Sequence, residues 1–156
     1  MHLLAQEEYG LRCILQVARH SGGSPLTIPE IAEAEGLSNE YTAKLMRELR
    51  RGGLLMSTRG VGGGYQLARP AGEISCWDVV QVLGGSFFPE SFCETHPGQL
   101  RDCIHSTDCS VRAVWSTVES TVRALLSRIS LEDMQKCEPE VLVQLTVAPE
   151  LQPTSS

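Results

Sequence analysis

The sequence predicts a mainly α-helical protein with a small β wing, arranged as a winged helix-turn-helix domain plus a long C-terminal helix. Two short amphipathic helical patterns are separated by a glycine-containing turn. Two strand-like runs then flank a glycine-rich segment at residues 60–64. Farther along, apolar residues recur every three or four positions from 115 to 129. A chain of 156 residues is expected to form one domain, or one small domain with an appendage.

A helix-turn-helix pair is predicted at residues 27–51, after a first helix at 9–20. Thr27 and Glu30 match a capping box, Gly36 supplies a tight turn, and Ser38 caps the second helix of the pair. Apolar spacing at three and four residues defines the inward faces. The residues expected to face inward are Leu11, Ile14, Leu15, Ala18, Ile28, Ile31, Ala32, Leu45 and Leu49.

A two-stranded wing is predicted directly after this pair, from residues 54–59 and 65–67. The five residues between the strands are Gly60, Val61, Gly62, Gly63 and Gly64, which tolerate positive φ angles and close approach to another surface. A phosphate-binding P-loop is excluded, because no Lys-Ser or Lys-Thr follows the glycines into a helix.

The C-terminal half is predicted to hold a short helix and then a long one. Ser75 caps the short helix, in which Trp77, Val80 and Leu83 share one stripe expected to be core. The long helix is expected at about residues 107–129. Its stripe is a heptad seam that predicts pairing with a second subunit, packing on its own domain being the alternative. The seam residues are Trp115, Val118, Val122, Leu125 and Ile129, and a short capped helix is expected over residues 129–134.

These elements divide the chain into five parts. They are a winged helix-turn-helix domain (1–72), a connecting helix and apolar loop (73–92), a cysteine loop (93–109), a dimerisation helix with a short capped helix (110–135) and a C-terminal tail (136–156), disordered from 149 to 156.

Three of the six cysteines fall in the cysteine loop, with the spacing C-x9-C-x5-C at Cys93, Cys103 and Cys109. Three thiols on one short loop suit a thiophilic centre that takes a fourth ligand from elsewhere. Spacing alone leaves open an iron–sulfur cluster, a structural zinc site and three unmetallated, redox-active thiols. Cys13, Cys76 and Cys137 are expected to be packing or surface thiols.

The net charge of −6 by itself argues against a nucleic-acid partner, but the charge is unevenly distributed. Residues 38–70 carry six basic and two acidic groups. Residues 1–37 carry two basic and five acidic groups, and residues 71–156 carry five and twelve. One basic block between two acidic ones predicts a local phosphate-contacting surface.

Other functional classes are disfavoured. The chain has no nucleophile–base constellation and no Cys-x-x-Cys pair, so an enzyme is not expected. No apolar run reaches about 18 residues, and no charged start precedes an apolar run at the N-terminus, so neither membrane insertion nor export is expected. The protein is therefore expected to be cytoplasmic. Thiols stay reduced in the cytoplasm, which favours ligand or redox cysteines over disulfides.

Three segments carry a family resemblance: Arg-Gly-Val-Gly-Gly-Gly-Tyr-Gln-Leu at 59–67, the pattern from Gly36 to Leu54 with Tyr41, Leu45 and Leu49, and Ile-Ser-Cys-Trp-Asp-Val-Val at 74–80. They resemble the IscR/NsrR family of winged helix-turn-helix transcription regulators, over residues 1 to about 135. The resemblance implies a homodimer that binds double-stranded operator DNA of two-fold symmetry. It also implies a [2Fe–2S] or [4Fe–4S] cluster that senses iron–sulfur status, nitric oxide or redox state.

By this resemblance Cys93, Cys103 and Cys109 are the cluster ligands, although the usual family spacing is C-x5-C-x5-C. One branch takes a histidine three residues after the last cysteine, where this chain has Arg112, which cannot ligate. Another branch takes a carboxylate of the partner subunit, and Glu8 stands at the matching position. Glu8 is therefore the first choice, with a solvated carboxylate favoured by the helix dipole as the alternative. His105 and His96 are the reserve ligands.

Resemblance and outward placement together assign the DNA contacts. The residues near the start of the recognition helix are Ser38, Asn39, Glu40, Tyr41 and Lys44; the phosphate contacts are Arg47, Arg50 and Arg51; and the wing contributes Arg59, Gly62 and Gly63. A core position is the alternative for Tyr41. The alternatives at the level of function are a thiol- or zinc-based regulator of the same fold without a cluster, and a winged-helix module that binds protein.

Overall fold

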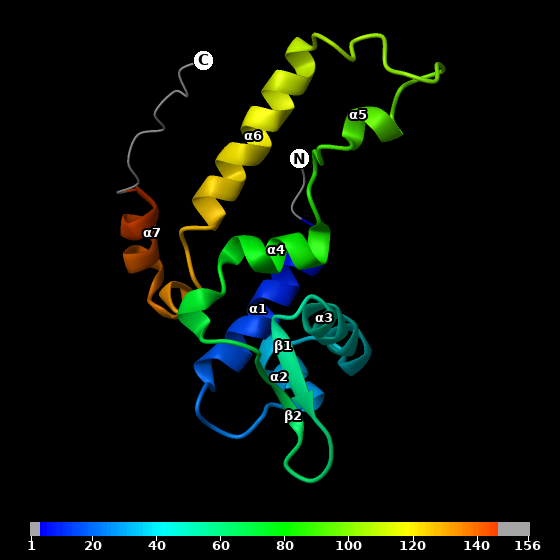
Figure 1. Cartoon of the computed structure of the whole chain (residues 1–156). Coiled ribbons are helices and arrows are strands. Elements are labelled where there is room, and N and C mark those ends of the chain that lie inside the picture. The colour runs from blue at the N-terminus through cyan, green and yellow to red at the C-terminus, as the bar shows by residue number, and fades with distance from the viewer. Residues whose placement is uncertain (1–3, 147–156) are drawn as a thin grey trace.

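A computed structural model describes residues 4–146 and confirms the predicted fold class (Figure 1). The helices are α1 (Ala5–Arg19), α2 (Ile28–Glu35), α3 (Asn39–Arg51), α4 (Cys76–Gly84), α5 (Phe92–Thr95), α6 (Ser110–Leu126) and α7 (Glu138–Thr146). Strands β1 (Leu55–Thr58) and β2 (Gly64–Leu67) form the wing, and short 3-10 turns cover Ala71–Glu73 and Asp133–Gln135.

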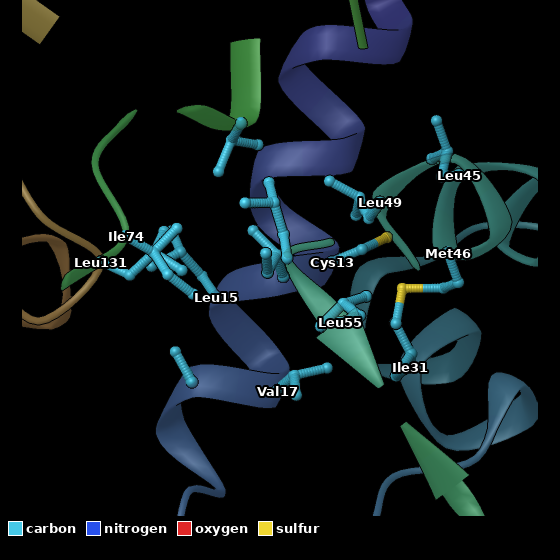
Figure 2. Packing of buried hydrophobic residues seen from close by; sticks show 14 residues of the cluster. Cys13, Leu15, Val17, Ile31, Leu45, Met46, Leu49, Leu55, Ile74 and Leu131 are labelled. Atoms are coloured by element: carbon cyan, nitrogen blue, oxygen red, sulfur yellow. The ribbon is translucent and has the colours of Figure 1, made fainter. Parts of the chain in front are cut away.

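Helix α1 lies at the centre of the winged domain, with α2, α3, α4 and the wing packed around it (Figures 1 and 2). Its buried residues include Cys13 and Ile14, which meet Ile31 of α2 and Leu49 of α3 in one apolar cluster. Burial raises the pKa of the Cys13 thiol to about 12. A buried neutral thiol of this kind behaves as a small apolar side chain.

The turn between α2 and α3 forms as the sequence predicts. Gly36 adopts the left-handed conformation with φ 66°, which ends α2 without a steric penalty. At the start of α2, the Glu30 carboxylate accepts a hydrogen bond from the Thr27 backbone N–H at 2.8 Å. Ser38 then caps α3, because its Oγ accepts a hydrogen bond from the Tyr41 backbone N–H at 3.2 Å.

The wing is a two-stranded antiparallel ribbon in which Leu55 pairs with Leu67 and Thr58 pairs with Gly64. A third segment extends it, because the backbone of Leu26 exchanges two hydrogen bonds with Tyr65, at 3.1 and 2.7 Å. Leu55 is buried, so the base of the ribbon belongs to the core. The tip at Val61 is fully exposed.

The stripe predicted for α4 is wrong in its phase. Cys76 and Val79 are the buried residues, whereas Trp77 and Val80 are only half-buried. The Cys76 backbone pairs with Ile129, and Cys76 and Val79, three positions apart on one face, are the residues buried against the domain. Leu83 does pack on the core, as predicted, against Gly10 of α1.

Helix α6 is shorter than predicted, and Ile129 does not belong to its seam. The helix ends at Leu126, a turn follows at residues 127–128, and Ser130 then forms an antiparallel bridge with Ser75, which precedes α4. The Cys76 N–H donates to the Ile129 carbonyl at 2.7 Å, and the Leu131 N–H donates to the Ile74 carbonyl at 2.8 Å. This pairing turns Ile129 into the core, where it is 4% exposed.

Two further elements appear where the sequence indicated none. Helix α7 lies within the segment assigned to the C-terminal tail, and one helical turn, α5, begins the cysteine loop. The short capped helix expected at 129–134 is a 3-10 turn, whose Asp133 carboxylate accepts from the Ser130 N–H at 3.0 Å. The disorder predicted for residues 149–156 lies outside the described residues.

Because Ile129 is a core residue, Ile129→Ala should lower the free energy of unfolding by about 2–5 kcal/mol. Denaturant unfolding followed by circular dichroism measures the change. Val61→Ala at the exposed wing tip is the control and should leave stability within about 0.5 kcal/mol of the parent. Equal effects of the two substitutions would contradict the placement of Ile129.

Candidate functional site

The three cysteines of the predicted set line one cavity of about 410 Å³. Each comes from a different part of the chain: Cys93 from α5, Cys103 from the irregular loop, and Cys109 from the residue that precedes α6. All three side chains are half-buried and none is in a disulfide. The fold therefore brings together thiols that lie up to sixteen residues apart in the sequence.

The other walls of this thiol cavity are mostly apolar and aromatic. They consist of Phe87, Phe88, Phe92, His96, Val111, Arg112 and Trp115. Sequence reasoning treated the apolar run at 87–92 only as a loop and missed its role as a wall. An apolar lining limits access of water, which in general influences the potential of an iron–sulfur centre.

Cys109 occupies the N-cap position of α6. Its Sγ accepts a hydrogen bond from the Arg112 backbone N–H at 3.3 Å. The exposed N–H groups and the dipole of a helix N-terminus favour negative charge. This position therefore suits a sulfur that carries negative charge, as a metal-bound thiolate does.

The donor set fits an iron–sulfur cluster in its chemistry. Soft thiolates are the ligands that such clusters take, and in a cluster they are distributed over more than one iron atom. Three thiols around one cavity match that requirement. Within residues 4–146, no three His, Cys, Asp or Glu side chains converge closely enough to hold a single metal ion.

The candidate fourth donors differ in their placement. Glu8 is exposed on α1 and does not line the thiol cavity, so within one subunit it stands apart from the three cysteines. His96 does line the cavity, and its ring stacks on Phe92 with centroids 4.3 Å apart. His105 is exposed and lies outside the lining.

The predicted nucleic-acid interface lies on α3 and the wing. Ser38, Asn39, Glu40, Lys44 and Arg47 are exposed along the first two turns and the middle of α3. Tyr41 is half-buried, and its ring meets that of Tyr9 edge-on, with centroids 6.1 Å apart. Tyr41 thus packs on the domain while one side remains accessible.

The positive charges of this face are only partly neutralised. Arg51 pairs with Glu48 at 3.3 Å, and Arg50 donates to Ser57 Oγ of β1 at 3.2 Å. Lys44, Arg47 and Arg59 have no carboxylate within 4 Å in the described part of the chain. These three cations are therefore available for an external anion such as a phosphate.

The glycines of the wing tip have a conformational reason to be there. Gly62 has φ 75°, in the left-handed region. A Cβ added at Gly63 would collide with the Thr58 carbonyl oxygen. Both glycines are thus required for the tight loop, whether or not they also contact a partner.

Comparison with known proteins decides the family. The sequence profile of the Rrf2 family, described as an iron-dependent transcriptional regulator, matches residues 3–136. The chain belongs to the Rrf2 family. Protein rrf2 of Nitratidesulfovibrio vulgaris is 34% identical over 136 residues, covering 87% of this chain and 88% of the relative. The HTH-type transcriptional regulator IscR of Vibrio atlanticus is 33% identical over 142 residues, covering 91% and 79%.

Solved structures of Rrf2-type regulators share the fold. IscR of T. potens superposes with a TM-score of 0.68 at 32% identity, covering 86% of each chain. CymR, the global cysteine regulator of B. subtilis, also gives 0.68, at 27% identity, covering 86% of this chain and 95% of CymR. This Rrf2-family chain is thus a DNA-binding transcriptional regulator, and these relatives are not enzymes. No helix within residues 4–146 is long and apolar enough to cross a membrane.

Ser38 caps α3 and is exposed at the predicted DNA-facing end of this helix, and two substitutions separate the observed role from the predicted one. Ser38→Asp keeps an acceptor for the Tyr41 N–H and should retain stability, whereas Ser38→Ala should cost about 1 kcal/mol. The aspartate adds a negative charge at the predicted DNA-facing end of α3, so it should weaken DNA binding. Unfolding curves and fluorescence anisotropy with labelled DNA measure the two effects. Unchanged affinity in Ser38→Asp would place the DNA elsewhere.

Proposed function

We propose that this protein is a homodimeric transcription regulator whose operator affinity depends on an iron–sulfur cluster held by Cys93, Cys103 and Cys109. One observation carries the proposal: three thiols line a single, largely apolar cavity at the N-terminal end of α6. The similarity to relatives named IscR supports it. The cluster is [2Fe–2S] or [4Fe–4S], and it supplies a centre that reacts with oxidants or nitric oxide, or is lost when iron is scarce.

Several residues of the chain are proposed to hold the cluster. Cys109 contributes a sulfur positioned by the first turn of α6, and Cys93 and Cys103 complete the thiolate set. Glu8 of the partner subunit is the proposed fourth donor, because the family resemblance places a partner carboxylate at this position; within its own chain Glu8 does not line the thiol cavity. His96 and His105 are the reserve donors. A harder oxygen or nitrogen ligand beside three thiolates would leave one weakly held iron.

The proposed dimer forms through α6. Val111, Val114, Trp115 and Leu125 are 61%, 57%, 43% and 41% exposed on this helix. Large apolar side chains that lie exposed together along one face of a helix are uncommon on the surface of a monomer, and they indicate an interface. A second copy of α6 offers the same stripe, so an isologous pairing would cover both.

The proposed coupling runs along α6. Its N-terminal end holds Cys109, and the residues after its C-terminal end pair with α4 of the winged domain. A change at the cluster would shift α6 against its partner and so alter the spacing of the two α3 helices. Operator affinity depends on this spacing, because two half-sites lie about one turn of DNA apart.

Cys93→Ser, Cys103→Ser and Cys109→Ser should each abolish the visible absorbance of protein purified without oxygen. Each should also change operator affinity about 5- to 150-fold, the usual range of allosteric coupling, without loss of stability. Iron and sulfide analysis, visible absorption and anisotropy with labelled operator DNA measure these effects.

Two matched variants control this experiment. Cys137→Ser removes an exposed cysteine outside the thiol cavity and should keep both colour and affinity. Arg59→Ala should keep the colour but lower operator affinity. If the parent protein is colourless after growth with ample iron, the cluster is refuted. Bound zinc would then indicate the zinc-based alternative, and an operator affinity that changes on oxidation would indicate the thiol-based one. A protein that shows no salt-dependent DNA binding would be a protein-binding module.

Leu125→Glu should weaken the dimer by at least about tenfold in dissociation constant, because association would bury an unpaired carboxylate. Ser120→Glu, at an exposed position on another face of α6, is the control and should leave the dimer intact. Analytical ultracentrifugation at several concentrations measures the dissociation constants. Equal behaviour of the two variants would exclude this face of α6 as the interface.

A further inference from the structure

Arg112 has an unusual place among the basic residues of the chain. It lines the thiol cavity with Cys93, Cys103 and Cys109. It also lines an adjoining cavity of about 360 Å³, which contains Cys93 and Cys103 together with Glu90, Glu94 and Asp102. Among the described residues, no other arginine or lysine lines the thiol cavity, since Arg101 lines only the adjoining one.

The hydrogen bonds of Arg112 join the cysteine loop to α6. Its backbone N–H donates to Cys109 Sγ at 3.3 Å, and its side-chain Nη1 donates to the Ser106 carbonyl oxygen at 3.1 Å. One residue thus holds the last ligand and the loop segment that precedes it. The irregular backbone between Cys103 and Cys109 is fixed to the helix at this point.

The position is electrostatically unfavourable for a cation unless negative charge lies nearby. Arg112 is in the first turn of α6, where the helix dipole favours anions, and this turn has no acidic residue. No carboxylate lies within 4 Å of its guanidinium in the described part of the chain. The guanidinium therefore forms no close ion pair like those of Arg12, Arg51 and Arg69, although Glu90, Glu94 and Asp102 line the adjoining cavity.

We propose that Arg112 is a positioning residue of the cluster site, in which its guanidinium balances the negative charge of the thiolates and their cluster. This inference rests on the proposed function. Three thiolates leave the site anionic, and one-electron reduction adds a further negative charge. A fixed cation at the wall stabilises the reduced state and so raises the reduction potential. Its bond to Ser106 keeps the loop folded over the site.

Arg112→Gln removes the charge and should make one-electron reduction by dithionite about tenfold less favourable, which is about 59 mV for one electron. Arg112→Lys keeps the charge and should keep the potential near that of the parent. Arg123→Gln is the matched control, because it removes the same charge from an exposed position of α6 outside the thiol cavity. Redox titration followed by visible absorption measures all four proteins.

A second measurement needs no cluster. Hydrogen exchange of residues 103–109 in the metal-free protein, followed by mass spectrometry, should speed up in Arg112→Gln but not in Arg123→Gln, because only the first loses the bond to Ser106. If Arg112→Gln holds no cluster, retention by Arg112→Lys supports the charge role and loss in both overturns it. An unchanged potential in a fully loaded Arg112→Gln overturns the inference while the proposed function stands. A parent protein without iron and sulfide refutes both.

Discussion

The backbone pairing between residues 74–76 and 129–131 is the constraint on which the arrangement of the molecule depends. Two backbone hydrogen bonds, between Cys76 and Ile129 and between Leu131 and Ile74, join a segment that follows the wing to one that follows α6. The pairing buries Ile129 and Leu131 beside α1, so the end of the long helix becomes part of the winged domain. Helix α6 is thereby joined, through a short turn at residues 127–128, to the body that presents α3.

The six cysteines fall into groups that the physical environment separates. Cys13 and Cys76 are buried among apolar residues, and desolvation raises the pKa of Cys76 to about 11. Such thiols remain protonated and serve as packing groups. The three cavity cysteines are half-buried and line the thiol cavity. Cys109 Sγ also accepts a hydrogen bond from a backbone N–H in the first turn of α6. Burial and capping thus distinguish structural thiols from candidate ligands in a single small protein.

Local sequence rules predicted the winged domain well because its elements are short and strongly capped. The Ser38 cap and the positive φ angles of Gly36 and the wing glycines are local features, which depend only on residues nearby in the sequence. The rules failed where contacts distant in sequence decide. The heptad pattern continued through Ile129, and only the pairing with Cys76 shows that the helix ends earlier. Residue spacing could not show that the aromatic residues and Arg112 line one cavity with the cysteines, because this cavity forms only when the loop folds back on α6.

The position of the cysteine loop restricts how a cluster could influence DNA binding within one subunit. In Figure 1 the loop lies beyond the N-terminal end of α6, and the wing lies at the other end of the molecule. With 17 residues, α6 is about 25 Å long. The Debye length in physiological salt is about 8 Å, so the effect of a change of charge at the loop is largely screened over the length of α6. Within one subunit, the proposed signal would therefore reach α3 through the position of α6 rather than through the electric field of the cluster.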